Sequence, residues 1–172
     1  MTHDEKDFEI TEIGDQLREA MRYWGSGVTI VSSVFEGERH GMTVSSFTSL
    51  SLEPPLVMVS LSVGSRTFGL VEKSGVFGIT LLNHEQLEIS NRFAGRETEM
   101  SDRFEGLATV ALITGAPLLA EGLARMDCRV VATHPAGMNT VFFGEVLASA
   151  VAADAEQQKP LGYYNRGYRH IE

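Results

Sequence analysis

The stretch HGMTVSSFTSLSLEPPLVMVSLS, residues 40–62, holds the clearest structural signal of the chain. Residues 43–51 carry six hydroxyl side chains within nine positions, and Pro54 and Pro55 follow. Residues 55–62 are then apolar at both alternating sets of positions, which is typical of a strand buried on both faces of a sheet. We therefore expect a central strand directly after a segment rich in short polar side chains.

The segments around this stretch predict more β-structure. Residues 28–35, VTIVSSVF, are rich in β-branched side chains and predict a strand, and a turn at 36–39 would join it to the strand that begins at Thr43. Further strands are predicted at 76–82, 124–134 and 139–151, with a turn at 135–137, and a closing strand or hairpin at 161–171. Many antiparallel strands with few helices favour a barrel or a sandwich.

Helices are expected to be few and short. Residues 12–24 show helical spacing of apolar side chains, and such a stripe usually packs on a core. Residues 65–75 and 83–93 begin with capping residues, residues 94–106 are predicted to form a surface loop, and residues 1–10 are predicted to be loosely ordered. The stripe of the first helix comprises Ile13, Leu17, Ala20, Met21 and Trp24.

Composition places the chain among single-domain globular proteins, with one domain over residues 1–172. It has 172 residues, 43% of them hydrophobic and 22% charged, and a net charge of −9, which disfavours nucleic acid or an acidic membrane as a partner. The acidic N-terminus lacks the order of a signal peptide, so we expect a cytoplasmic protein.

The cysteine and the histidines give no sign of a metal site. Cys128 is the only cysteine and lies in a predicted strand, which favours a buried, inert thiol. The five histidines show no spacing typical of metal ligands, and His40 is predicted to lie on the surface.

The hydroxyl-rich segment has two interpretations. Alternate residues of a strand share a face, so this strand would have one apolar face toward the core and one face of small hydroxyls. A flat ligand could lie against the hydroxyl face, or that face could simply be exposed to water. The hydroxyl face would hold Thr43, Ser45, Ser49 and Ser51, and the apolar face Val44, Leu50 and Leu52.

A second polar site is predicted where the 55–62 strand leads into the next helix. Ser65, Arg66 and Thr67 open that helix, whose first N–H groups have no internal partner and lie at the positive end of the helix dipole. These groups could bind a phosphate. Ser65 could equally well act only as the helix cap, or do both.

Several motifs, in this order, resemble those of the flavin reductase family. The resemblance covers about residues 20–171, and its most specific part is the 40–62 stretch. The motifs are GVTIVSS (27–33), HGMTVSSFTSLSLEPPLVMVSLS (40–62), SRTF (65–68), SGVFGITLL (74–82), NRFAG (91–95), GAPLL (115–119), VFFGEV (141–146) and PLGYYNRGYRHI (160–171).

This resemblance implies a mainly β fold with short helices, an antiparallel split β-barrel of the FMN-binding type. It implies a homodimer that binds FMN or FAD and takes electrons from NADH or NADPH. The implied activity is that of a flavin:NAD(P)H oxidoreductase, which supplies reduced flavin to a separate monooxygenase component. The alternative is a non-enzymatic flavin carrier or sensor of the same fold.

The resemblance also implies site residues, none of them a catalytic acid or base, because the cofactors carry the hydride chemistry. The flavin-binding stretch falls on Thr43, Val44, Ser45, Ser46, Phe47, Thr48 and Ser49. The phosphate-binding turn falls on Ser60, Leu61, Ser62, Ser65, Arg66 and Thr67. Arg92 and Phe93 would approach the flavin and its phosphate, and Tyr168 and Arg169 the nicotinamide side.

One motif departs from the family. Many members have Gly-Asp-His-x-x-Phe before the long strand, with the His near the nicotinamide. Here the segment is GMNTVFFG, so that Met138 replaces the Asp and Asn139 replaces the His. Asn139 keeps hydrogen-bonding capacity but cannot carry a positive charge, which puts the use of nicotinamide in question and favours the carrier alternative. The chain also lacks a dinucleotide-binding glycine fingerprint, so we expect the nicotinamide to bind briefly over the flavin.

Overall fold

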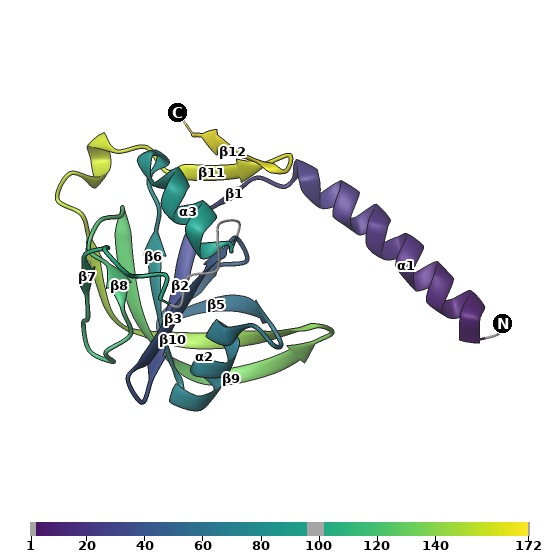
Figure 1. The fold of residues 1–172 in the computed structure, drawn as a ribbon, viewed down its shortest axis with the longest axis horizontal. Coiled ribbons are helices and arrows are strands. Elements are labelled where there is room, and N and C mark those ends of the chain that lie inside the picture. The colour runs from purple at the N-terminus through teal and green to yellow at the C-terminus, as the bar shows by residue number, and fades with distance from the viewer. Residues whose placement is uncertain (1–2, 96–101, 172) are drawn as a thin grey trace.

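The computed structural model describes residues 3–95 and 102–171, with side chains from residue 12 onward. It confirms a mainly β, antiparallel class (Figure 1). The helices are α1 (His3–Ala20), α2 (Arg66–Ser74) and α3 (Leu87–Phe93), with 3-10 turns η1 (Met21–Tyr23), η2 (His84–Gln86) and η3 (Ala155–Gln157). The strands are β1 (Ser26–Gly27), β2 (Thr29–Phe35), β3 (Glu38–Val44), β4 (Thr48–Leu52), β5 (Pro55–Ser62), β6 (Val76–Leu81), β7 (Thr109–Val110), β8 (Leu118–Leu119), β9 (Ala124–Ala136), β10 (Asn139–Val151), β11 (Leu161–Tyr164) and β12 (Gly167–His170).

The main sheet has seven strands in the order β3-β2-β6-β9-β10-β5-β4. β5 lies between β10 and β4 and pairs antiparallel with both. Its residues Val57, Val59 and Leu61 are buried, whereas Met58 and Ser60 are only half-buried. The prediction of a strand buried on both faces is therefore wrong for one face, because that face borders a cavity.

Two apolar clusters form the core. One packs α2 against the main sheet and contains Val59, Val71 and Phe77. The other lies under α3 and the β11–β12 hairpin, which pairs with β1 in a separate three-stranded sheet, and contains Phe93 and Phe104. Phe104 was expected in a surface loop over 94–106, but it is 1% exposed, and residues 96–101 of that loop lie outside the described part.

Local capping rules hold for two predicted helices. Ser65 caps α2, and Gly75 ends it in the left-handed conformation with φ of 69°. Asn83 and Gln86 form the predicted capping box ahead of α3. These signals act within a few residues, so tertiary packing does not override them.

α1 runs outward from the body of the molecule, as Figure 1 shows. It begins at His3, well before the predicted start near residue 12. Ile13, Leu17, Met21 and Trp24 are 57%, 61%, 51% and 69% exposed, so the prediction that this stripe packs on the core of the chain is wrong. The helix projects beyond the rest of the domain, so Ile13 and Leu17 face outward, whereas Met21 and Trp24, which follow it, border a cavity. None of the described helices combines the length and hydropathy that crossing a bilayer requires.

Candidate functional site

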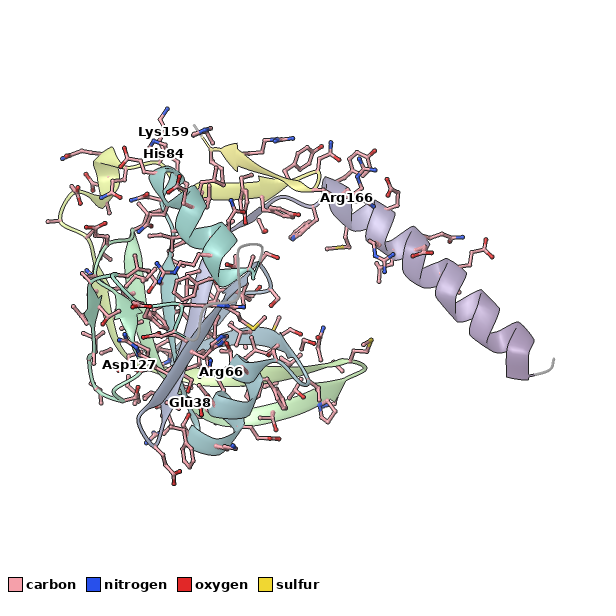
Figure 2. All side chains as sticks on the ribbon, viewed as in Figure 1. Glu38, Arg66, His84, Asp127, Lys159 and Arg166 are labelled. Atoms are coloured by element: carbon pink, nitrogen blue, oxygen red, sulfur yellow. The ribbon has the colours of Figure 1, made fainter. Side chains whose placement is uncertain are left out.

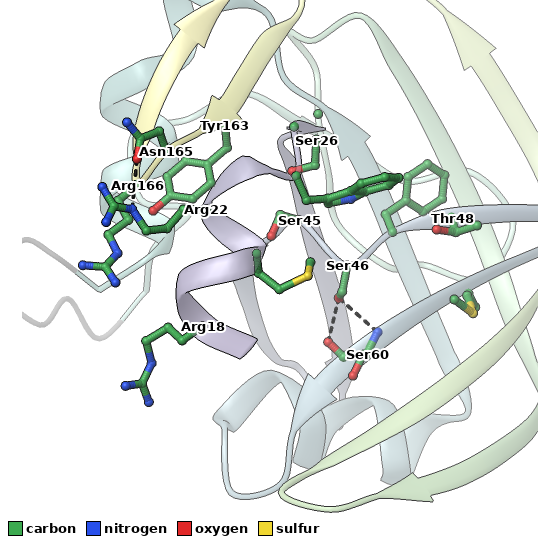
Figure 3. Close-up of a pocket in the computed structure, with 16 residues that line it drawn as sticks. Arg18, Arg22, Ser26, Ser45, Ser46, Thr48, Ser60, Tyr163, Asn165 and Arg166 are labelled. Atoms are coloured by element: carbon green, nitrogen blue, oxygen red, sulfur yellow. Dashed lines mark hydrogen bonds between the residues drawn. The ribbon is translucent and has the colours of Figure 1, made fainter. Parts of the chain in front are cut away.

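A cavity of about 730 Å³ lies between the C-terminal end of α1, the link from β3 to β4, β5 and the β11–β12 hairpin (Figure 3). It is lined by Arg18, Met21, Arg22, Trp24, Gly25, Ser26, Gly27, Ser45, Ser46, Phe47, Thr48, Met58, Ser60, Tyr163, Asn165 and Arg166. Five predicted flavin-site residues are thus brought together here: Ser45, Ser46, Phe47, Thr48 and Ser60.

The hydroxyl-rich link reaches the cavity because β3 ends at Val44, a core residue, and β4 begins only at Thr48. The Ser46 hydroxyl donates to the carbonyl oxygen of Ser60 at 2.9 Å and accepts from the Ser60 N–H at 3.2 Å. This exchange ties the link to β5 in the manner of a short strand ladder (Figure 3). Ser45 and Thr48 remain exposed beside it.

The predicted alternation beyond this link is wrong. Leu50 and Leu52 are 43% and 84% exposed and do not face the core. β4 is the edge strand of the sheet, and its pairing with β5 shifts register between Ser49 and Ser51. A register shift of one residue moves side chains to the opposite face, so a pattern continued from β3 fails in β4.

Ring faces and apolar groups form other parts of the wall. Phe47 packs on the first core cluster, and Met58 comes from β5. The Tyr163 ring lies edge to face with Tyr168, 5.5 Å between centroids, and Trp24 is 69% exposed. The cavity therefore offers hydroxyls, backbone groups and aromatic faces to one ligand, a mixture suited to a flat heteroaromatic ring.

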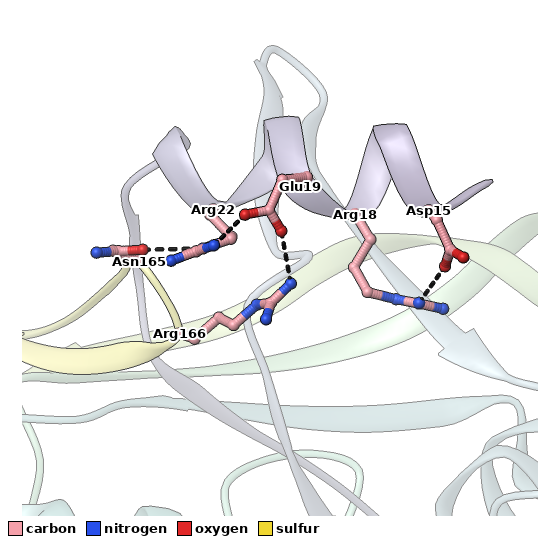
Figure 4. A network of polar contacts seen from close by, with 6 residues as sticks. All are labelled: Asp15, Arg18, Glu19, Arg22, Asn165 and Arg166. Carbon is pink, nitrogen blue, oxygen red and sulfur yellow. Dashed lines mark hydrogen bonds and ion pairs between the residues drawn. The ribbon is translucent and has the colours of Figure 1, made fainter. Parts of the chain in front are cut away.

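Three guanidinium groups stand at the edge of the cavity; Arg18, Arg22 and Arg166 are called the arginine rim below (Figure 4). Arg22 Nε donates to Asn165 Oδ1 at 2.9 Å, and Arg22 also pairs with Glu19. Arg166 pairs with the other oxygen of Glu19 at 2.8 Å, and Arg18 pairs with Asp15. The contacts of Arg22 with Asn165 and of Arg166 with Glu19 hold the end of α1 against the β11–β12 turn, whereas the Arg18–Asp15 pair lies within α1.

The start of α2, the second predicted site, is a capped helix end. Ser65 Oγ accepts from the Phe68 N–H at 3.2 Å, so the capping interpretation is confirmed. Arg66 pairs with Glu38 of β3 at 2.7 Å, and this contact lowers the pKa of Glu38 (Figure 2). Thr67 is fully buried, so its side chain faces the interior.

His40 joins β3 to this helix start. It was expected on the surface but is 7% exposed, and its Nδ1 is hydrogen-bonded to Thr67 Oγ1 at 2.8 Å. Burial, followed by the charges of Arg103 and Arg66, lowers the pKa of His40 to about 4. The imidazole is therefore neutral at pH 7, and it links the strand that leads into the hydroxyl-rich segment with the first turn of α2.

The residues predicted on the nicotinamide side lie in two different places. Asn139 is exposed at the β9–β10 turn and pairs with Ser62 at the end of β5, and the Val63 N–H donates to the Met138 carbonyl at 3.0 Å. Tyr168 and Arg169 belong to β12, where Tyr168 Oη accepts from Ser90 Oγ at 2.8 Å. None of the three is among the residues lining the cavity.

The remaining predicted residues also lie around the cavity rather than in its lining. Thr43 donates to the Ser90 carbonyl at 2.6 Å, and Arg92 donates to the Glu105 carbonyl at 2.6 Å. Val44, Leu61 and Phe93 are core residues, so only their backbone is available to a ligand. Ser49 and Ser62 are exposed.

Sequence reasoning missed the residues contributed by α1, β1 and the β11–β12 turn. Asn165 and Arg166 lie within the C-terminal motif PLGYYNRGYRHI, but the family resemblance implies a role only for Tyr168 and Arg169 of that motif. The signal that could have found them is Asn165, a residue type favoured in turns, between two short predicted strands. Cys128 is buried as expected, and burial raises the pKa of its thiol to about 12.

Comparisons with known proteins agree with this geometry. Residues 21–172 match the family model of the flavin reductase like domain. The chain is 37% identical over 174 residues to an NADH-dependent flavin reductase of a Rhodococcus species, covering 99% of this chain and 93% of the relative. It is 35% identical over 157 residues to the reductase component of 4-hydroxyphenylacetate 3-monooxygenase of Thermus thermophilus, covering 91% and 96%.

A solved structure shows the same fold. The structure of nitrilotriacetate monooxygenase component B from Mycobacterium thermoresistibile superposes with a TM-score of 0.86 at 32% identity, covering 94% of this chain and 88% of that one. The match covers most of the chain.

Proposed function

The chain belongs to the flavin reductase family and is an oxidoreductase of that family, and from this premise we propose that it reduces FMN or FAD with NADH or NADPH in the cavity of Figure 3. The reduced flavin would serve a separate monooxygenase component, as the names of several relatives state for those proteins. The carrier alternative is disfavoured, because relatives covering most of the chain are named as reductases.

One observation carries the proposal: the link Ser45–Thr48, fixed to β5 through Ser46 and Ser60, faces the same cavity as Met58 and Tyr163. When bound, the flavin supplies the acceptor for hydride and the nicotinamide supplies the donor. The residues of the cavity would orient the two rings. Backbone groups and hydroxyls of the link would hold the polar edge of the flavin ring, and the apolar side chains would contact its face.

We further propose that the flavin phosphate binds at the start of α2. β5 runs from Ser60, in the cavity, to Ser62, a distance of about 7 Å at the usual rise per residue of a strand. This is comparable to the reach of a ribityl chain, so a ring in the cavity could place its phosphate near Ser65. Arg66 would add positive charge, shared with Glu38.

For the nicotinamide side we keep Asn139, Tyr168 and Arg169 as candidates. Asn139 lies beside Ser62 and is exposed, so its amide is open to a ligand bound over the flavin. Tyr168 packs behind Tyr163, which lines the cavity, so it would act by fixing that ring.

We also propose a homodimer. Ile13 and Leu17 of α1, together with the exposed Leu50 and Leu52 of β4, would be covered by a second copy of the chain. Exposed apolar stripes of this kind mark association surfaces in soluble proteins.

Anaerobic absorbance spectroscopy tests the activity directly. We expect loss of the oxidised flavin absorbance when NADH or NADPH is added to the protein with FMN or FAD. Flavin binding without bleaching by either nucleotide would show a carrier instead.

A further inference from the structure

The β11–β12 turn carries an arginine where glycine would be unstrained. Asn165 and Arg166 connect the paired residues Tyr164 and Gly167, and their φ angles are 51° and 59°. Positive φ at both central positions is the pattern of a type I′ turn, which favours glycine at the second position. A side chain kept there against the preference of the backbone points to a function.

The β2–β3 turn provides an internal comparison. It is also a two-residue hairpin turn with positive φ, 49° at Glu36 and 81° at Gly37, and its second position is the favoured glycine. The two turns differ in what they face. The β11–β12 turn borders the cavity through Asn165 and Arg166, whereas neither Glu36 nor Gly37 lines it.

The charges around Arg166 do not cancel. The arginine rim has three guanidinium groups, and the carboxylates seen paired with them are Asp15 and Glu19. Glu19 is shared by Arg22 and Arg166 (Figure 4). Among the side chains that the structure describes, the three guanidinium groups thus share two paired carboxylates, in a chain whose net charge is −9. Guanidinium groups with this arrangement suit phosphate oxygens.

The arginine rim lies next to two aromatic rings, in a cavity with room for more than one ligand group. Trp24, 69% exposed, and Tyr163 line the same cavity as the rim and offer surfaces on which a base can stack. The cavity volume of about 730 Å³ lies high in the usual range for small-molecule sites, about 300–1,000 Å³, so it has room beside one mononucleotide.

We propose that the arginine rim binds the adenosine diphosphate end that FAD and NAD(P)H share and that FMN lacks, with Trp24 and Tyr163 as stacking faces for the adenine. This rests on the proposed function for the identity of the ligands. The competing explanation is that Arg22 and Arg166 serve only to fasten α1 to the hairpin through Glu19.

Two variants separate these explanations, because they break the same ion pair from opposite sides. Arg166→Gly removes the guanidinium and places the favoured residue in the turn, so the hairpin keeps its conformation. Glu19→Gln breaks the anchor and leaves the guanidinium free. If the rim binds phosphate, Arg166→Gly raises the Kd of ADP-ribose, measured by calorimetry, roughly tenfold. Glu19→Gln leaves that Kd unchanged or lowers it.

If Arg166→Gly and Glu19→Gln raise the Kd of ADP-ribose equally, the proposal is overturned, and the rim is only an anchor for α1. The absence of ADP-ribose binding by the unmodified protein would overturn it as well. Arg129→Gln is the matched control, since Arg129 pairs with Glu145 on the β9–β10 strands and does not line the cavity. We expect its Kd for ADP-ribose to equal that of the unmodified protein.

Two further measurements identify which dinucleotide uses the rim. If it is FAD, Arg166→Gly raises the Kd of FAD and not that of FMN. If it is the nicotinamide dinucleotide, the same variant raises the KM for NADH with FMN as the flavin, while both flavin affinities stay unchanged. Equal loss of affinity for FAD and FMN would overturn the proposal, because FMN lacks the adenosine end. Failure of the proposed function is a separate result: the unmodified protein would then not oxidise NADH with any flavin, although ADP-ribose would still bind.

Discussion

The two sides of the cavity are built in different ways. One side, called the β5 side here, is formed by the 45–48 link and by β5. Its segments are joined by backbone pairing and by the hydrogen bonds between Ser46 and Ser60, 14 residues apart in the sequence. The other side, called the α1 side, is formed by the end of α1 and the β11–β12 turn. It is joined by hydrogen bonds between Arg22 and Asn165, 143 residues apart in the sequence, and between Arg166 and Glu19, 147 residues apart. The first side grows out of a hydrophobic core, whereas the second depends on exposed polar side chains that hold a projecting helix. We therefore expect the β5 side to set stability and the α1 side to set association and ligand choice.

Matched truncations of two leucines give the largest expected contrast. Leu61 of β5 is 0% exposed and Leu17 of α1 is 61% exposed. Leu61→Ala should lower the free energy of unfolding by about 2–5 kcal/mol, since it leaves a cavity in a close-packed core. Leu17→Ala should change the free energy of unfolding of the monomer by no more than about 0.5 kcal/mol. Urea denaturation followed by circular dichroism measures both.

The same pair tests the dimer. If a second copy covers α1, Leu17→Ala weakens the dimer in analytical ultracentrifugation although the fold of each copy is intact. A monomeric unmodified protein at micromolar concentration would contradict the proposed dimer, and equal unfolding free energies for the two variants would contradict the contrast between the two sides.

His40 should make the stability of the fold sensitive to acid. Its pKa is lowered by burial from 6.5 to about 4, so the unfolded chain binds a proton that the folded chain does not between these pH values. Stability then rises with pH across this window, by about 3 kcal/mol from pH 4 to above pH 6.5. Denaturant midpoints measured at several pH values report this slope.

His40→Gln is the matched variant, because glutamine can still hydrogen-bond to Thr67 but does not titrate. We expect stability to depend less steeply on pH between pH 4 and 6.5, since the contribution of His40 is removed. An identical slope in both proteins would show that His40 does not contribute to it.

Ser65 tests the proposed phosphate site within the same side. Ser65→Ala should reduce the binding free energy of FMN by about 1.5–3 kcal/mol if the hydroxyl bonds to the phosphate. The binding free energy of riboflavin, which lacks the phosphate, should fall much less. Flavin fluorescence quenching gives both dissociation constants. Equal weakening of the two ligands would assign Ser65 to capping alone, through its bond to the Phe68 N–H.

Sequence patterns predicted the β5 side better than the α1 side, for a physical reason. The apolar run of β5, the cap at Ser65 and the hydroxyl-rich link are local features, and their consequences appear within a few residues. Periodicity in α1 correctly indicates an apolar face, but it does not reveal whether that face packs on the core of its own domain. The edge position of β4, which leaves Leu52 exposed, likewise depends on strand order.

The burial of His40 could not be predicted for a similar reason. A histidine at a hairpin is usually exposed, and only the packing of α2 over β3 places Thr67 within 2.8 Å of its ring. The arginine rim is the extreme case, because its members come from both ends of the chain. Long-range polar contacts leave almost no periodic trace in a sequence.

Asn139→His should have the smallest effect and the most specific one. Asn139 is the exposed first residue of β10, next to the β9–β10 turn, so an imidazole fits without repacking. If the side chain lies near the nicotinamide, the variant should lower the KM for NADH or NADPH severalfold and leave flavin affinity nearly unchanged, because a contact made equally in the ground and transition states acts mainly on KM. Steady-state kinetics with both nucleotides, together with FMN titrations, measure the two effects.

The neighbourhood of Asn139 gives this test a second possible answer. Asn139 pairs with Ser62, at the turn proposed to bind the flavin phosphate, so a partly protonated histidine there could attract that phosphate instead. FMN would then bind more tightly at pH 6 than at pH 8 in the variant, and riboflavin would not. That result would assign residue 139 to the phosphate site and not to the nicotinamide site. Tyr168 and Arg169, on β12, would then be the remaining candidates for contact with the nicotinamide. The nicotinamide would in that case approach the flavin from the side of the cavity that α1 and the β11–β12 hairpin build.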